Sequence, residues 1–238
     1  MIKKIRDLNI NYIQYGKGKD VVLLHGWGQN IQMMDPLGKN ISDNHRITIL
    51  DLPGFGSSET PSYAYNISDY TEILHDFLET LSIENPILIG HSFGGRIAIS
   101  YASIYKVEKL VLFGSPFIVR EKKGLKIKIL KSLKKIKALN GVAEFMKNHM
   151  GSTDYRAASG VMREIMVKTV NTDLTENAKK IKVPTLLIWG EQDEAVPVSE
   201  AKELEKLLID GALIVLPGTH YCYLENLGRV VNILDNFI

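Results

Sequence analysis

Cysteine is nearly missing from this sequence, since Cys222 is the single one among 238 residues. One cysteine excludes an internal disulfide framework and fits a reducing compartment. The Cys/His spacing of structural zinc sites is absent as well. No apolar run approaches the roughly 20 residues of a membrane span, and residues 1–7 are charged without an apolar segment or cleavage site behind them. These absences predict a cytoplasmic protein without a stable membrane anchor.

A strong charge of one sign is also lacking, because the formal net charge is only +2. This balance conceals two opposite parts: residues 115–182 hold sixteen Lys and Arg against six Asp and Glu, whereas the remainder holds thirteen against twenty-one. The basic part carries no nucleic-acid-binding motif. Three interpretations of it stay open: a solvated face that complements an acidic core, attraction of anionic substrates or acyl carriers, or transient contact with a membrane.

What the sequence does contain is a G-x-S-x-G motif centred on Ser92. The apolar residues 87–89 predict a buried strand directly before it, and residues 96–102 are compatible with a helix after it. A serine in such a tight turn has strained backbone geometry, so Gly90 and Gly94 are needed around it. The turn exposes the hydroxyl at a helix N-terminus, where developing negative charge is stabilised. Ser92 is therefore the candidate nucleophile, and a purely structural turn is the alternative.

Strand and helix patterns alternate along the chain. Apolar runs predict strands at residues 2–5, 9–15, 21–24, 46–50, 87–89, 107–113, 182–190 and 212–216, the first two as an antiparallel edge hairpin. Helical spacing predicts helices at residues 67–81 with Ser68 as the cap, at 96–102, from Ser199 or Pro197 to about 208, and from 222 to 237. This alternation predicts an α/β fold, with a mostly parallel sheet and helices on both faces.

The alternation stops in the middle of the chain. Amphipathic helical patterns among lysines occupy residues 125–139, 142–150 and 159–170. The predicted organisation is a core domain over residues 1–116 and 183–238, with a helical cap over 117–182. Because ligands bind beyond the carboxyl ends of parallel strands, the cap is expected to cover that edge.

Residues 25–28, His-Gly-Trp-Gly, follow a predicted strand and form a corner that exposes backbone N–H groups. Attack of a serine on a carbonyl needs two such donors to bind the oxyanion. In hydrolases with G-x-S-x-G, one donor is the amide after the nucleophile, here Phe93, and the other comes from this early loop. The position predicts the Trp27 amide, with a simple tight turn as the alternative. The Pro- and Gly-rich residues 51–58 are predicted to line the rim of a cleft.

A serine hydroxyl needs a general base, and the base needs a carboxylate that orients it. Of the six histidines, His220 follows the last strand and is predicted at the same sheet edge as Ser92. His91 is expected to point away from Ser92, and His25 to be structural. His220 is therefore the candidate base, and a loop histidine with a structural role is the alternative.

The loop after the strand at 182–190 offers the acid. Asp193 lies at its centre, and Glu191 and Glu194 are the alternatives. Some hydrolases place the acid after the preceding strand, but residues 114–116 contain none. The order Ser92, Asp193, His220 is also the one expected of this fold.

Together these residues resemble the α/β-hydrolase family over essentially the whole chain. The resemblance rests on residues 25–28 (HGWG), 51–57 (DLPGFGS), 90–95 (GHSFGG), 184–193 (PTLLIWGEQD) and 217–220 (PGTH). Within the family the chain is similar to small carboxylesterases with a helical cap and to hydrolases of carbon–carbon bonds in ring-cleavage products. Haloalkane dehalogenases and epoxide hydrolases differ, since they carry aspartate at the position of Ser92. Proline aminopeptidases differ at residues 25–28.

The resemblance implies a serine hydrolase that cleaves carboxylic esters or thioesters through an acyl-enzyme. Ser92, His220 and Asp193 would form the triad, and the amides of Trp27 and Phe93 the oxyanion hole. This chemistry needs no metal or organic cofactor, and the expected partner is a small acyl substrate rather than nucleic acid. A carbon–carbon bond hydrolase or an acyltransferase would use the same triad. A binding module without catalysis is a further alternative.

Overall fold

The computed structural model of the chain describes residues 1–119 and 160–238. In that part of the chain, eight strands form one sheet in the order β1-β2-β4-β3-β5-β6-β7-β8. The strands are β1 (Ile2–Ile5), β2 (Leu8–Gly16), β3 (Lys19–Leu24), β4 (His45–Leu50), β5 (Ile87–His91), β6 (Lys109–Phe113), β7 (Thr185–Gly190) and β8 (Gly211–Leu216). The first two strands pair antiparallel and all pairs from β4 to β8 are parallel. The predicted α/β class and antiparallel first hairpin are confirmed.

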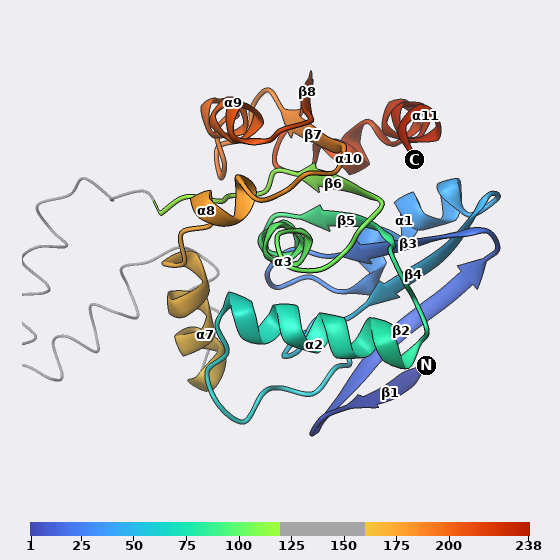
Figure 1. Ribbon diagram of the computed structural model, residues 1–238, viewed down its shortest axis with the longest axis vertical. Helices are drawn as coiled ribbons and strands as arrows, with labels where there is room; N and C mark the ends of the chain where they lie inside the picture. The colour runs from blue at the N-terminus through green and yellow to red at the C-terminus, as the bar shows by residue number, and fades with distance from the viewer. Residues whose placement is uncertain (120–159) are drawn as a thin grey trace, which may run out of the picture.

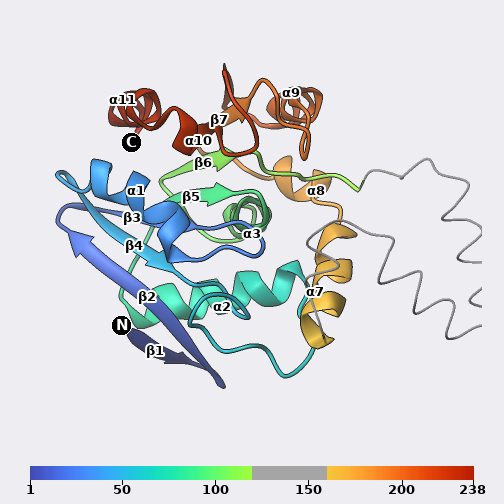
Figure 2. The ribbon, with the colours of Figure 1, turned by 180° about the vertical axis from the view of Figure 1, so that it is seen from behind.

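Two apolar cores lie on the two faces of the sheet. Successive residues of a strand point to opposite faces, so in β3 Val22 and Leu24 enter one core and Val21 and Leu23 the other. One core is covered by α2 (Ile67–Thr80), α3 (Phe93–Ala102) and α9 (Val198–Leu207). The other is covered by α1 (Ile31–Ile41), α10 (Cys222–Glu225) and α11 (Leu227–Phe237). Helices on both sides of the sheet, visible in Figure 1 and from behind in Figure 2, agree with the prediction.

Helix α2 has the predicted extent, but its predicted cap is wrong. Asn66, not Ser68, is the N-cap: its side chain accepts from the Asp69 N–H at 3.1 Å. The Asp69 carboxylate accepts in turn from the Asn66 N–H at 2.7 Å. This reciprocal capping box satisfies two amides that the first helical turn leaves without partners, which one serine hydroxyl cannot do.

The structure adds α1, to which no predicted element corresponds. Pro36 and Gly38 lie inside it and weaken the helical pattern, yet the Asn30 side chain caps its N-terminus and its apolar residues face the second core. The predicted helix from 222 to 237 is divided into α10 and α11 at Asn226, whose side-chain amide donates to the carbonyls of Pro217 and Cys222.

Part of the predicted cap is described. α7 (Gly160–Val170) begins one residue after the predicted start, and α8 (Thr175–Ala178) follows. α7 lies beside the segment that leads into α2 (Figure 1), where Lys168 Nζ donates to the Ala64 carbonyl at 2.6 Å. The helical patterns at 125–139 and 142–150 lie outside the described residues. The extent of the cap stays a prediction.

Candidate active site

Ser92 occupies the sharp turn between β5 and α3. Its φ of 51° and ψ of −110° are strained for a residue with a side chain. The turn is tight enough that a Cβ on Gly90 would lie 2.6 Å from the Gly95 Cα, and one on Gly94 would lie 2.4 Å from the Leu24 carbonyl oxygen. Both glycines are therefore required by close approach of the backbone. The predicted strand, turn and helix are all present.

The loop after β3 lies directly against this turn. The Gly94 N–H donates to the His25 carbonyl at 3.1 Å and joins the two segments. Neither the Trp27 amide nor the Phe93 amide has a hydrogen-bond acceptor among the residues that the structure describes. The Trp27 and Phe93 rings pack edge-to-face at 5.2 Å. Two N–H donors on adjoining segments are the arrangement that an oxyanion hole requires.

His25 fixes the same loop through both nitrogens of its ring. The Leu52 N–H donates to His25 Nε2 at 3.0 Å, so Nε2 is the acceptor nitrogen. Nδ1 carries the proton and donates to the Gly26 carbonyl at 2.7 Å. Burial lowers the pKa of His25 to about 4 and keeps the ring neutral. The predicted structural role is therefore specific: a neutral imidazole fastens the 25–28 loop to the 51–58 loop.

His220 and Asp193 are in direct contact. His220 Nδ1 lies 2.8 Å from Oδ2 of Asp193, whose side chain is 0% exposed. The other oxygen, Oδ1, accepts from the N–H groups of Ala195 and Val196 at 2.9 and 2.8 Å. A carboxylate fixed in this way presents one oxygen to Nδ1 and leaves Nε2 of the imidazole for a proton from elsewhere.

The two alternative acids do not share this environment. Glu191 and Glu194 are exposed side chains at either side of Asp193. Neither has a contact with His220 among the described residues. Of the three candidate acids, Asp193 is the one beside the imidazole.

The end of β6 brings Ser92 and the His220–Asp193 pair to one place. The Ser92 N–H donates to the Phe113 carbonyl at 2.9 Å. The next residue, Gly114, lies so close to the pair that a Cβ there would be 2.9 Å from His220 Nδ1 and 3.0 Å from Asp193 Oδ2. The Ser92 hydroxyl itself makes no hydrogen bond to a described residue. The structure therefore joins His220 to Asp193 directly and Ser92 to them through the backbone of β6.

Comparison with known proteins identifies the family of the chain. The profile of the family described as alpha/beta hydrolase fold matches residues 20–126. The 2-hydroxy-6-oxononadienedioate/2-hydroxy-6-oxononatrienedioate hydrolase of Paraburkholderia phymatum is 30% identical over 225 residues, which are 81% of this chain and 77% of that protein. The chain belongs to the α/β-hydrolase fold family.

Two further comparisons extend over nearly the whole of this α/β hydrolase. The monoacylglycerol lipase ABHD6 of Mus musculus is 26% identical over 259 residues, covering 94% of the chain and 76% of the lipase. The crystal structure of a bromoperoxidase from Bacillus anthracis has a TM-score of 0.80 at 25% identity and covers 100% of the chain and 98% of that structure. The protein is an α/β-fold hydrolase enzyme.

An aromatic wall that sequence patterns did not identify surrounds Phe93. Phe55 lies 4.9 Å from Trp27 and 6.0 Å from Phe93 between ring centroids, and Tyr70 lies 5.1 Å from Phe93. The Tyr70 hydroxyl donates to the Pro53 carbonyl at 2.9 Å and fixes the loop that carries Phe55. The sequence predicted that residues 51–58 line the rim of a cleft, and Phe55 belongs to this segment. Its position next to the loop at residues 25–28 results from tertiary packing, which the sequence pattern does not show.

Asp51 is a buried carboxylate near these aromatic residues, and three donors hydrogen-bond to its oxygens. It accepts from the Ile31 and Ser57 N–H groups and from the Asn11 side chain, each at 2.8 Å. These three hydrogen bonds join Asp51 to the 51–58 loop, to the start of α1 and to β2.

Neither a metal nor a membrane span is indicated in the described part of the α/β hydrolase. Residues 1–119 and 160–238 contain no group of three or more His, Cys, Asp or Glu that could hold a metal ion. Within the same residues no helix has the length and apolar character needed to cross a membrane. Cys222 is buried, which raises the pKa of its thiol to about 12 and makes it unreactive.

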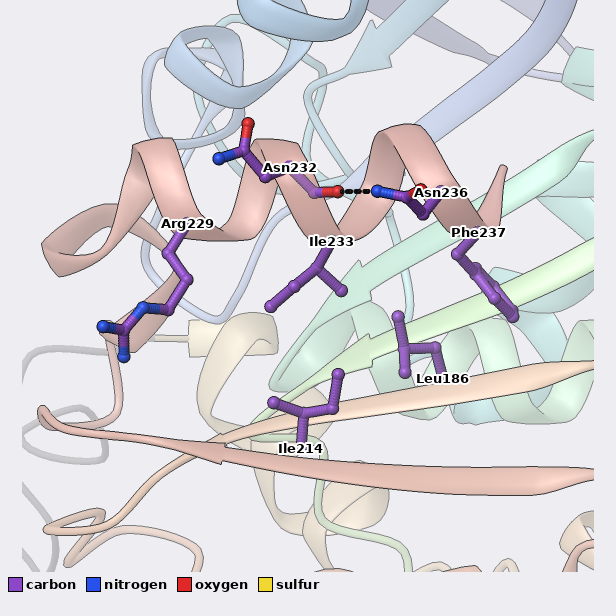
Figure 3. Close-up of a pocket in the computed structure, with 7 residues that line it drawn as sticks. All are labelled: Leu186, Ile214, Arg229, Asn232, Ile233, Asn236 and Phe237. Atoms are coloured by element: carbon purple, nitrogen blue, oxygen red, sulfur yellow. Dashed lines mark hydrogen bonds between the residues drawn. The ribbon is translucent and has the colours of Figure 1, made fainter.

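A surface hollow of about 460 Å³ lies away from these residues, between α11 and the last two strands (Figure 3). It is lined by Leu186, Ile214, Arg229, Asn232, Ile233, Asn236 and Phe237. None of them is a candidate catalytic residue. The surface of the hollow is mainly apolar, and the hydrogen bond from Asn236 to the Asn232 carbonyl is internal to the helix.

Two of the buried histidines, His25 and His91, predict that acid destabilises the enzyme. Burial lowers the pKa of His25 to about 4 and that of His91 to about 3. In the unfolded chain both titrate near 6.5, so below that pH the unfolded state binds more protons and stability falls. At pH 5 each ring is expected to remove about 2 kcal/mol from the free energy of unfolding relative to pH 8. Urea unfolding at the two pH values measures this difference.

His75→Gln is the matched control for this effect, because His75 is a partly exposed histidine on α2. His25→Asn is expected to reduce the difference between pH 8 and pH 5 by about half, whereas His75→Gln leaves most of it. Equal stability of the wild type at both pH values would contradict the assignment of two neutral buried rings.

Proposed function

We propose that this α/β hydrolase cleaves carboxylic esters or thioesters of modest size through an acyl-enzyme on Ser92. The observation that carries the proposal is the His220–Asp193 contact at 2.8 Å, at the strand end to which the Ser92 backbone is hydrogen-bonded. Asp193 holds the tautomer in which Nε2 of His220 accepts a proton. The nucleophile, base and orienting acid are thus supplied by three loops at one sheet edge.

The reaction proceeds in two halves. The Ser92 hydroxyl oxygen attacks the acyl carbon while Nε2 of His220 takes its proton, and the oxyanion binds the N–H groups of Trp27 and Phe93. The acyl–oxygen or acyl–sulfur bond then breaks, and the imidazolium returns the proton to the departing alcohol or thiol. Water repeats the sequence against the acyl-enzyme and releases the carboxylic acid. One oxyanion-hole donor lowers the activation free energy by about 3 kcal/mol.

The charge distribution supports an acyl group with a negative charge or a carrier. Residues 115–182 have an excess of ten positive charges, and the rest of the chain an excess of eight negative charges. Positive potential near an active site raises the local concentration of anionic substrates, and this effect weakens with salt. A p-nitrophenyl ester of a dicarboxylic acid, compared with the neutral ester of equal length at low and high salt, measures this preference.

A second candidate function is hydrolysis of a carbon–carbon bond. It is favoured by the relative from Paraburkholderia phymatum, whose name describes a hydrolase of 2-hydroxy-6-oxononadienedioate and 2-hydroxy-6-oxononatrienedioate. The same three side chains would serve both reactions, so the substrate decides between them. The ester reaction is preferred here because the mouse lipase, an ester hydrolase by name, matches 94% of the chain.

The test uses the wild-type enzyme. Intact-mass detection of a fluorophosphonate adduct is combined with turnover of p-nitrophenyl esters of two to eight carbons, their thioester counterparts and a 2-hydroxy-6-oxo dienoate. We expect one adduct and a kcat/KM for the best ester at least about tenfold above that for the dienoate, a difference of about 1.4 kcal/mol. The reverse ratio would establish the carbon–carbon hydrolase. Ester products formed faster than acid with added alcohol would indicate an acyltransferase, and folded protein with neither adduct nor turnover would contradict catalysis.

Gly114→Ala is predicted to slow turnover. The added methyl group would lie 2.9 Å from His220 Nδ1, and Gly114 has a φ of 47°, so the imidazole and the carboxylate must separate. A displacement near 1 Å in a catalytic group costs about 100-fold in kcat. Gly228→Ala is the matched control, because nothing lies within 4 Å of a Cβ there. Equal kcat for the two variants would contradict the close approach at Gly114.

A further inference from the structure

His91 lies between the two loops on which the proposed reaction depends. It is the last residue of β5, directly before Ser92, and its side chain is 0% exposed. Its ring centroid is 4.8 Å from that of His220 and 4.9 Å from that of Tyr223. The prediction that it points away from the nucleophile agrees with this burial. The His91 side chain points instead toward the loop that carries His220, the candidate base.

The contact with that loop is a hydrogen bond to its backbone. His91 Nε2 lies 3.0 Å from the carbonyl oxygen of His220. A carbonyl only accepts, so Nε2 carries the proton and donates. Burial, and then the charge of His220, lowers the pKa of His91 to about 3. The ring is therefore neutral at physiological pH, and its single N–H is committed to the backbone of His220.

The opposite side of the His91 ring contacts the loop after β3, which carries Trp27 and is here called the oxyanion loop. Nδ1 lies 3.2 Å from the side-chain oxygen of Gln29, and that oxygen accepts from the Gly26 N–H at 2.9 Å. In the tautomer that donates to the His220 carbonyl, Nδ1 has no proton, so Nδ1 and the Gln29 oxygen lie next to each other without a hydrogen bond between them. Gly26 itself approaches so closely that a Cβ on it would be 2.9 Å from Nδ1. One imidazole thus touches both the base loop and the oxyanion loop.

The loop at residues 217–221, which carries His220 and is here called the base loop, is also held by other contacts. Those contacts involve other atoms than the His220 carbonyl. Asp193 fixes the ring of His220 through Nδ1. The preceding residue, Thr219, is held through its N–H and hydroxyl by Glu225. The carbonyl of His220 accepts a hydrogen bond from His91, which lies 129 positions earlier in the chain and directly precedes Ser92. This hydrogen bond links the backbone of His220 to the residue that precedes Ser92.

We propose that His91 is a positioning residue for the general base, acting through the backbone of His220. The inference rests on the proposed function, since it gives His220 and Ser92 the roles assigned above. His91 does not touch the reacting atoms. The hydrogen bond from its N–H holds the backbone of His220 in the position from which Nε2 reaches the Ser92 hydroxyl. Without this hydrogen bond, the loop that carries His220 can move relative to the turn at Ser92.

The test separates the hydrogen bond from the packing of the ring. His91→Leu keeps a bulky side chain at this buried position and removes the donor, whereas His91→Gln can place an amide N–H where Nε2 was. We expect His91→Leu to lower kcat for the best ester by about 10- to 100-fold with KM within about twofold, and to slow fluorophosphonate labelling equally. His91→Gln is expected to restore kcat to within about threefold of the wild type.

His45→Leu is the matched control. His45 is also buried and its Nδ1 contacts a backbone carbonyl, that of Ile41, at 3.0 Å, but it lies at the start of β4, the opposite end of the parallel strands from Ser92. An equal loss of kcat in His45→Leu and His91→Leu, or no rescue by His91→Gln, would overturn the inference and leave a packing role. If His91→Leu does not fold, His91→Asn, which is too short to reach the carbonyl, takes its place with the same expectations. Absence of turnover and labelling in the wild type would instead refute the proposed function.

Discussion

Ser92→Ala is expected to reduce ester turnover to the background rate and to abolish the fluorophosphonate adduct. Removing the serine of a triad lowers kcat by about 10⁶-fold, because no other group can form the covalent intermediate. The variant keeps the strained turn, so its fold should be retained. The measurements are intact mass after labelling and release of p-nitrophenol with the best ester.

Ser100→Ala is a fitting comparison. Ser100 lies on the same helix α3 and hydrogen-bonds Thr71 at 2.8 Å, but it is buried in the body of the helix and does not belong to the turn. Its loss is expected to reduce stability by about 1 kcal/mol and to leave labelling intact. An adduct that persists in Ser92→Ala would show that another nucleophile reacts and would contradict the proposed mechanism.

The sequence allowed the candidate site to be located because its signals are local. Ser92, Asp193 and His220 each follow a strand within a few residues, and parallel strands end at one edge of the sheet. The turn around Ser92 also has a strict steric requirement, which two glycines reveal without any tertiary information. The fold class followed from the same alternation of apolar runs and helical patterns.

The residues that the sequence did not reveal act through long-range contacts. Gly114 matters because it lies against His220 and Asp193, and nothing in residues 114–116 shows that approach. His91 matters because of a bond to a residue 129 positions away. Likewise, α1 is stabilised by packing against the second core, which outweighs the unfavourable Pro36 within it.

Two roles for one residue type follow from the environment of each ring. His25 and His91 are buried and neutral, with each N–H committed to a backbone carbonyl. The side chain of His220 is 16% exposed and has a carboxylate beside Nδ1. A ring in apolar surroundings resists protonation, whereas a ring beside a carboxylate can accept a proton during the reaction. Burial and the available partner, more than sequence position, therefore distinguish the structural histidines from the candidate base.

Asp193→Asn is expected to lower kcat by about 10⁴-fold while the fold persists. The side-chain oxygen of asparagine can still accept from the Ala195 and Val196 N–H groups, as Oδ1 does now. The amide NH₂ then faces Nδ1 of His220 and forces the tautomer with the proton on Nε2. That nitrogen can no longer take the proton of the Ser92 hydroxyl, so both the acylation rate and fluorophosphonate labelling fall.

The neighbouring acids supply the comparison that makes this result specific. Glu191→Gln and Glu194→Gln remove one negative charge each from the same loop, but both side chains are exposed and neither contacts His220 in the described structure. Their kcat values are expected to stay within about twofold of the wild type, because an exposed charge at this distance is screened by water and salt. A loss in Glu191→Gln or Glu194→Gln as large as that in Asp193→Asn would mean that the loop charge, and not an orienting hydrogen bond, supports the base. That result would contradict both the role assigned to Asp193 and its control of the His220 tautomer.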